Sequence, residues 1–438
     1  MTILGVFVGL IIIGLMMLVH EAGHFLAGKL LNFKIIEFSI FMGPRLFSTE
    51  KDGIKYSFKL LPIGASVQFA GEYPESSDID QTIDADDPGL FFNRPRWARA
   101  IVVAMGPIAN FFTAFLASII LFTAFGVAIP IADQPPGNSL AYEQGLEAGD
   151  KILRLNGNRI RTSADYSMVR TLIEPDQDLI LEIQKPSGEI KELILKPGNR
   201  ENYRLGIVQS ITGDQKNMVL SVDPESNQGN PVLHEGDILL AVNDIPFSDP
   251  QSAFEIAQSS GEQVKVRVIR TGQELELDVK TTLYNDPIPD GIFFTESRAA
   301  GDIVYQALQY PWSIVKSTVK GISMIFGGQM KFSESVTGPV GLVKMFSDVV
   351  SENAKTANLA LAIYQLLFYF ILISVAIGFT NLLPIPPLDG HHLLILAIEG
   401  IRRKDLPDRF KHVIAAVGMI LILTLAAIVI YLDIRRIF

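Results

Sequence analysis

The sequence His20-Glu21-Ala22-Gly23-His24 lies at the end of an apolar run that extends from Ile3 to Val19. On a helix, residues four apart share one face, so the two imidazoles can hold one zinc ion while Glu21 stands beside it. Zinc held in this way lowers the pKa of a water ligand toward ~7, and a nearby glutamate can take the proton as the water attacks a peptide carbonyl. The motif predicts a metalloprotease centre with metal ligands His20 and His24 and with Glu21 as the base.

The helix that carries this motif is long and apolar enough to cross a membrane. It has no basic residue before it, and we therefore expect a retained transmembrane helix rather than a cleaved signal peptide. A charged side chain near the centre of such a helix costs roughly 2–3 kcal/mol. Polar residues are normally kept at that depth for a role, which disfavours the alternative that they only pack helices together.

Composition supports a membrane part joined to a soluble part. The 438 residues are 48% hydrophobic, the net charge is -10, and there is no cysteine. A net negative charge argues against a nucleic acid partner. Without cysteine, disulfides are excluded and a zinc site must use histidines and carboxylates.

Three further segments are long enough to span a membrane, which needs ~20 apolar residues: 101–129, 359–383 and 413–432. A doubtful fifth, 303–326, carries several polar residues and is typical of an amphipathic helix at the surface. Lys and Arg are abundant in the loops between spans one and two and between spans three and four. The positive-inside rule places both loops in the cytoplasm and residues 130–357 outside. His20 then lies in the cytoplasmic part of the bilayer.

The first loop has a β pattern in residues 46–73. Ile54, Tyr56 and Phe58 alternate with polar residues, and Asp52-Gly53 is a hairpin turn signal. A second apolar run, 60–71, is expected to fold back into the membrane beside the metal. Two interpretations stay open. The run packs on the helices as a lid, or residues Gly64, Ala65, Ser66 and Val67 form an edge strand that holds substrate by main-chain hydrogen bonds.

The external segment contains an internal repeat. The string from Leu146 to Asn156 recurs 87 residues later, from Leu233 to Asn243. Each copy is followed by a strand–turn–strand pattern, which predicts two tandem β-rich domains. The string L-x-x-G-D-x-I-L-x-x-N resembles PDZ domains of bacterial membrane proteases. Such domains bind extended peptides at a sheet edge, and the alternative is that the pair acts as a steric cover.

A catalytic zinc needs a third protein ligand and one open position. The string from Asn381 to Gly390, Asn-Leu-Leu-Pro-Ile-Pro-Pro-Leu-Asp-Gly, breaks the third span with prolines just before Asp389. Spans one and three cross in the same direction, so Asp389 is expected at about the depth of His20. Asp389 is the preferred third ligand, with His391 and His392 as rivals that the sequence does not exclude.

With these motifs in view, the chain resembles the site-two protease family of intramembrane zinc metalloproteases over essentially its whole length. Gly106-Pro107-Ile108-Ala109-Asn110 and Gly338-Pro339-Val340-Gly341 also fall in the family's order. The resemblance implies one zinc per chain on His20, His24 and Asp389, with Glu21 as base. It also implies that Asn381 helps to hold the substrate backbone and that 46–73 is a membrane-reentrant β-loop.

The resemblance further implies a stress-response enzyme of the bacterial inner membrane, surrounded by lipid, with its PDZ domains in the periplasm. Its partners would be transmembrane substrates: anti-sigma factors already cut on the outer side, and remnant signal peptides. Two other classes remain to be tested, a PDZ scaffold without catalysis and a metal transporter.

The predicted architecture is thus a membrane α-helical protein with four transmembrane helices, a reentrant β-loop and two tandem PDZ domains. Its expected parts, in order, are helix 1 at 1–31, a cytoplasmic-side loop at 32–97, helix 2 at 98–129, PDZ domains at 130–200 and 201–285, an amphipathic connector at 286–357, helix 3 at 358–390, and a cytoplasmic loop with helix 4 at 391–438.

Overall fold

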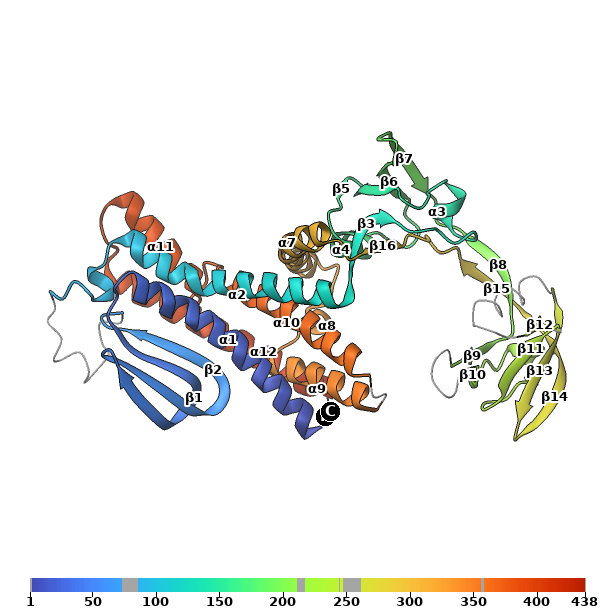
Figure 1. The fold of residues 1–438 in the computed structure, drawn as a ribbon, viewed down its shortest axis with the longest axis horizontal. Helices are drawn as coiled ribbons and strands as arrows, with labels where there is room; N and C mark the ends of the chain where they lie inside the picture. Colours follow the sequence, from blue (N-terminus) through green and yellow to red (C-terminus); the bar gives the residue numbers. More distant parts are fainter. Residues whose placement is uncertain are drawn as a thin grey trace. The chain divides into compact units, whose positions relative to one another are not determined.

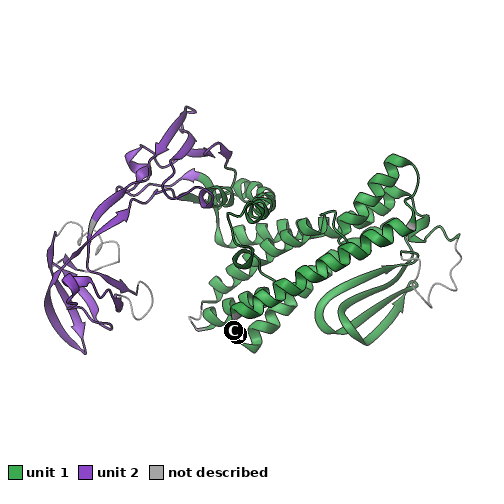
Figure 2. Ribbon diagram, turned by 180° about the vertical axis from the view of Figure 1, so that it is seen from behind, with its two compact units in different colours: residues 1–130, 160–169, 294–438 green, residues 131–159, 170–293 purple. Residues whose placement is uncertain are grey.

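The computed structural model describes residues 2–72, 86–210, 217–243, 245–246, 261–355 and 358–437. Residue 73, the end of the expected reentrant loop, lies outside them. The chain forms two compact units (Figure 2). Unit 1 comprises residues 1–130, 160–169 and 294–438, and unit 2 comprises residues 131–159 and 170–293.

Unit 1 is mostly helical (Figure 1). Its longer helices are α1 (Ile3–Leu30), α2 (Arg96–Phe125), α7 (Ala300–Phe326), α9 (Pro339–Lys355), α10 (Leu359–Asn381), α11 (Asp389–Arg402) and α12 (Asp408–Ile437). Shorter elements are η2 (Phe91–Asn93), α4 (Ser163–Thr171), α8 (Phe332–Ser335) and β16 (Phe294–Ser297), while β3 (Val127–Ala132) runs from unit 1 into unit 2.

Four of the described helices are long and apolar enough to cross a membrane: Ile3–Leu30, Arg96–Phe125, Leu359–Asn381 and Arg409–Arg436. This confirms the predicted number of spans. The helix α7 is not among them. Its polar side chains instead hold α4, because Lys316 forms an ion pair of 2.6 Å with the buried Asp165 and Ser313 accepts a hydrogen bond from Thr162.

Helix α1 packs closely against two neighbouring helices because it has glycines, which carry no side chain, at the contacts. A Cβ atom at Gly23 would stand 2.2 Å from the carbonyl oxygen of Met105 in α2. A Cβ atom at Gly5 would stand 2.6 Å from the Cα atom of Ser347 in α9. The backbone of the motif-bearing helix is thereby fixed against α2, which lies beside it in Figure 1.

The third span ends where the prolines predict. Helix α10 stops at Asn381, and α11 begins at Asp389. A Cβ atom at Gly390 would stand 2.2 Å from the carbonyl oxygen of Leu382, so only glycine permits this close return of the chain. The helix α11 occupies residues for which the sequence suggested a loop.

The strands β1 (Ile35–Lys51) and β2 (Ile54–Phe69) are long and bent, and they form four runs of one antiparallel sheet. Residues 35–40 pair on one side with 65–69 and on the other with 55–58, while 45–51 pair with 54–59. Asp52 and Gly53 have φ values of 54° and 73°, as a two-residue hairpin turn requires, which confirms that turn. Residues 61–69, called the outer strand below, form one edge of the sheet.

Unit 2 is mostly β. It contains the strands β4 (Lys151–Leu155), β5 (Asn158–Arg159), β6 (Leu179–Gln184), β7 (Ile190–Leu195), β8 (Asn199–Arg204), β9 (Ile207–Gln209), β10 (Val219–Val222), β11 (Ile238–Val242), β12 (Ile245–Pro246), β13 (Gln263–Arg270), β14 (Gln273–Lys280) and β15 (Thr282–Pro287), with the short helices α3 (Leu140–Glu143) and α5 (Ser226–Gly229). The predicted hairpins are present as β6–β7 and β13–β14. The ladder β8–β15 joins the two copies of the repeat.

The repeated string makes the same contacts twice. Asp150 is buried, accepts a hydrogen bond from the Glu147 amide, and pairs with Lys185 at 3.0 Å. Asp237 likewise accepts from the His234 amide and pairs with Arg270 at 2.7 Å.

The asparagine that ends each string accepts a hydrogen bond from the first strand of the following hairpin. Asn156 accepts a hydrogen bond from the Ile180 amide, and Asn243 accepts one from the Lys265 amide. The repeat read from the sequence is therefore a structural repeat.

We expect Asp237→Asn to destabilise the second copy by about 3 kcal/mol, because Arg270 keeps a partly buried charge without its partner. Burial raises the pKa of Asp237, but the hydrogen bonds and charge of Arg270 outweigh this and leave the pKa below its usual range. The stabilisation is therefore present above pH ~4 and is lost as pH falls further, so the variant and the wild type converge in acid.

Hydrogen exchange of the full chain, followed in β13 and β14, measures this effect. The control is Glu276→Gln, which breaks an exposed pair with Lys265 and should cost under ~1 kcal/mol. Equal protection in all three proteins at pH 7 would contradict the prediction.

Candidate metal centre

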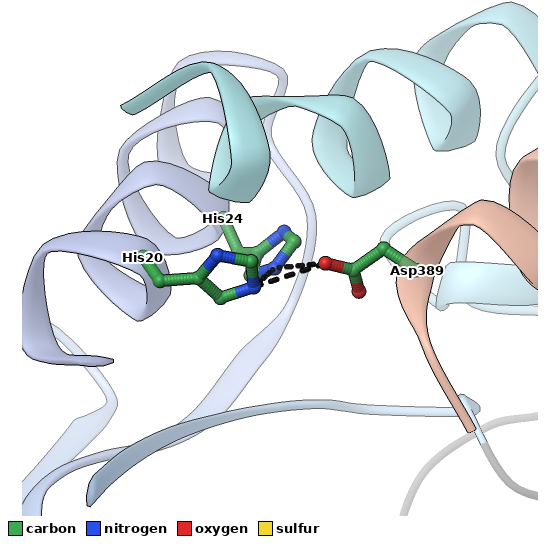
Figure 3. A group of neighbouring side chains, drawn as sticks. All are labelled: His20, His24 and Asp389. Carbon is green, nitrogen blue, oxygen red and sulfur yellow. Dashed lines mark hydrogen bonds and ion pairs between the residues drawn. The ribbon is translucent and has the colours of Figure 1, made fainter. Parts of the chain in front are cut away.

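Three side chains from two separate elements meet in unit 1 (Figure 3). His20 and His24 lie one turn apart on α1, and Asp389 is the first residue of α11. Asp389 Oδ2 lies 2.9 Å from His20 Nε2 and 3.5 Å from His24 Nε2, and the two Nε2 atoms are 3.1 Å apart. Both histidines are buried. The structure thus brings together all three residues that the sequence singled out as ligands.

The orientation of His24 is fixed by helix α2. Its Nδ1–H donates a hydrogen bond of 2.8 Å to the carbonyl oxygen of Val102, which leaves a lone pair on Nε2 of the neutral ring. A Cβ atom at Gly106 would lie 2.2 Å from His24 Nε2. Gly106 therefore leaves the space in which this imidazole can face Asp389.

His20 is held by Asn110, a residue whose role sequence reasoning missed. The Asn110 side chain is fully buried, and its Nδ2 lies 3.3 Å from His20 Nδ1. The other amide atom, Oδ1, is buried without a hydrogen-bond partner in the described part of the chain. Turning the amide by 180° presents Oδ1 to His20, which then donates from Nδ1–H and keeps a lone pair on Nε2. The only signal was the position of Asn110 at the end of the Gly106–Asn110 motif.

These contacts fit a zinc ion. With both Nδ1 atoms donating, two Nε2 lone pairs and a carboxylate oxygen converge with no proton between them. Ligand atoms on a tetrahedral zinc with bonds of ~2.0–2.1 Å stand about 3.3 Å apart, close to the three separations observed. His391 and His392 are not part of this group among the described residues, which favours Asp389 over its two rivals.

The other predicted site residues lie around this group. Glu21 Oε2 accepts a hydrogen bond of 2.9 Å from the Val67 amide, so the outer strand lies directly beside the motif. Ala65 and Ser66 also belong to the outer strand, where they pair with Ile40 and Ser39. Gly64 directly precedes them. Asn381 is the last residue of α10, at the break that leads to Asp389. The functional roles of Asn381 and of residues 64–67 stay predictions.

The fold and the site define a class: a metalloprotease whose HExxH helix is one of several helices able to cross a membrane. Comparison with known proteins agrees. The model of peptidase family M50 matches residues 8–425, and the chain belongs to that family.

Its curated relatives are of nearly equal length. The protease RseP of Yersinia pestis is 27% identical, with 98% of this chain and 97% of the relative covered. The regulator of sigma-E protease RseP of Escherichia coli is 26% identical with the same coverage. A protein of Rhizobium meliloti named as a zinc metalloprotease is 27% identical, with 98% and 96% covered. The chain is a zinc metalloprotease of the site-two protease type.

Graded losses of zinc are expected from the contacts around the site. Asp389→Ala should abolish tight zinc binding because it removes a ligand. Asn110→Ala should weaken binding about 10–100-fold, since His20 loses the group that orients it. Zinc affinity is measured by competition with a chelator.

Two variants serve as controls and should bind zinc as the wild type does. Ser118→Ala alters a buried hydroxyl on the same helix that donates to the Ala114 carbonyl oxygen within its own turn. His392→Ala removes one of the two rival ligands. Loss of zinc in His392→Ala would show that the ligand set is misassigned. Unchanged affinity in Asn110→Ala would refute the orienting role of Asn110.

Proposed function

We propose that this protein cuts the transmembrane segments of single-span membrane proteins inside the bilayer. The observation that carries the proposal is the place of the metal group. His20 and His24 lie within α1, one of the helices able to span a membrane, and Asp389 follows directly on the break that ends another. A peptide bond that reaches these residues must come from within or beside the membrane.

Each residue has a defined part in this proposal. His20, His24 and Asp389 hold the zinc, which when bound activates water and polarises a carbonyl. Glu21 stands next to both histidines on α1 and takes the proton. Asn381, at the open end of α10, binds the substrate main chain.

A transmembrane helix resists proteolysis because its amides and carbonyls are bonded to each other, and each group released in lipid costs several kcal/mol unless it finds a new partner. The outer strand supports a solution. The Val67 amide points away from Phe38, its paired residue, toward Glu21. Pairs alternate in an antiparallel ladder, so Ala65 points its main-chain groups the same way. An unwound substrate can add there as a further strand.

We further propose a bacterial inner-membrane location, with the β1–β2 sheet entering the bilayer from the cytoplasmic side and the two repeats, as PDZ domains, in the periplasm. Substrates of the anti-sigma factor type, trimmed first on the outer side, and remnant signal peptides suit such an enzyme. The name of the Escherichia relative, regulator of sigma-E protease, supports the anti-sigma factor type among these substrates.

The direct test uses purified full-length protein and a membrane-anchored model substrate. We expect zinc-dependent cleavage that a chelator stops, and a loss of at least ~100-fold in Glu21→Gln with zinc still bound. A glycine pair placed in the substrate segment should raise the rate, because it lowers the cost of unwinding.

The rival functions give other results. A scaffold without catalysis would leave the substrate intact in every sample. A metal transporter would instead move zinc across proteoliposome membranes, with flux that depends on His20 and Asp389.

The repeats in unit 2 are proposed to act as a size filter that keeps untrimmed substrates away. The second copy can be removed at the end of the β8–β15 ladder, because Arg204 pairs with Thr282 there. Replacing residues 205–281 by Asn-Gly closes this ladder as a hairpin and removes the second copy. Residues 160–169, which belong to unit 1, are untouched.

The excised protein should cleave a substrate with a bulky outer domain several-fold faster than the wild type does. Cleavage of the trimmed substrate should be unchanged and serves as the internal control. Unaltered discrimination between the two substrates would refute a filter role for the second copy.

A further inference from the structure

The outer strand ends with two amides that face away from the sheet, and a carboxyl group of the protein itself lies at each of them. The Val67 amide donates to Glu21. At Phe69, two residues further along the strand, the carboxyl group of Glu72 lies beside the backbone amide. Glu72 is also close enough to the metal centre for its charge to interact with Glu21, His24 and Asp389.

The two carboxylates differ in how they reach the strand. Glu21 comes from another element, α1, and a substrate carbonyl can displace it from Val67. Glu72 lies only three residues beyond Phe69 and folds back onto it through a turn at Gly71, whose φ is +73°.

Beyond Phe69 the chain is fixed in other contacts. The Ala70 amide donates to the carbonyl oxygen of Lys34, and the Ala70 carbonyl accepts from the Phe91 amide. Ala70 is fully buried. The edge open to a further strand therefore ends at Phe69, and Glu72 closes it.

A strand added to this edge needs something that fixes its register. Side chains alternate with a period of two, so a slip of two residues preserves every inward and outward side chain. The same slip moves the main chain by ~6.8 Å at ~3.4 Å per residue, which brings a different peptide bond to the metal. Because Glu21 bonds Val67, the metal centre stands opposite Val67, and the register alone selects the bond that is cut.

We propose that Glu72 is a positioning residue that stops the substrate strand at Val67 and so determines which peptide bond reaches the zinc. Because its carboxyl group lies at the Phe69 amide, Glu72 keeps a substrate from pairing with the next main-chain donor along the edge. The inference rests on the proposed intramembrane cleavage and adds a determinant of the cut site to it.

The test compares Glu72→Ala and Glu72→Gln in the full-length protein, with products of a membrane-anchored substrate identified by mass spectrometry. Glu72→Ala frees the Phe69 amide, so a second cut should appear two residues from the wild-type cut. Glu72→Gln keeps an acceptor oxygen and should cut only at the wild-type bond. A merely structural role would change the rate and leave the cut site alone.

A wild-type pattern in Glu72→Ala overturns the proposal, and so does the same shift in both variants. Failure of the wild type to cleave any membrane-anchored substrate would instead refute the proposed function, so the two failures are distinguishable.

Should Glu72→Ala be inactive, the register is read without catalysis. The chain has no cysteine, so Val67→Cys in a Glu21→Gln background provides a single crosslinking site for a cysteine scan of the substrate. With Glu72 present, we expect crosslinks at one substrate position. With Glu72→Ala, crosslinks should also appear two residues away, and their confinement to the original position overturns the proposal.

Discussion

The buried histidine pair imposes the constraint on which the other features depend. His24 donates its Nδ1 proton to the Val102 carbonyl. Asn110 Oδ1 has no other partner in the described part of the chain, and His20 can bond it only by donating from its own Nδ1. Both Nε2 lone pairs then face each other and a carboxylate, away from water. Such a group is unfavourable unless a cation lies between its members, so the protein around it is built to accept a metal.

The surrounding helices meet this constraint with glycines at close contacts and with a break between two helices. Gly23 lets α1 touch the backbone of α2, and Gly106 leaves the space that His24 occupies. The break after Asn381 and the tight turn at Gly390 bring the carboxylate of Asp389 beside the two histidines. The amides of Ile385 and Leu388 in the break donate hydrogen bonds to the carbonyl oxygens of Leu383 and Ile385.

Sequence reasoning succeeded where the chemistry is local and failed where it depends on contacts between distant segments. His20 and His24 are one helical turn apart, and the positive φ of Asp52 and Gly53 belongs to a two-residue turn, so spacing and residue type suffice for both. The contact of Asn110 with His20 joins residues 90 positions apart, and no periodicity in either helix records it. The double pairing of residues 35–40, with runs on both sides, was also hidden, because alternation shows that a strand exists but not how many partners it has.

Contacts between segments far apart in the sequence also bear on how such an enzyme selects a peptide bond. A substrate helix in lipid offers few distinguishing side-chain contacts, because apolar residues fit an apolar surrounding in many positions. Main-chain pairing at the outer strand is equally indifferent to sequence. Selection must then come from where the pairing edge begins and ends relative to the metal. In this structure Glu21 marks the position opposite the metal, and the edge closes one strand period later, at Phe69. Under the strand addition proposed above, a fixed edge next to a fixed metal turns non-specific strand pairing into a specific cut.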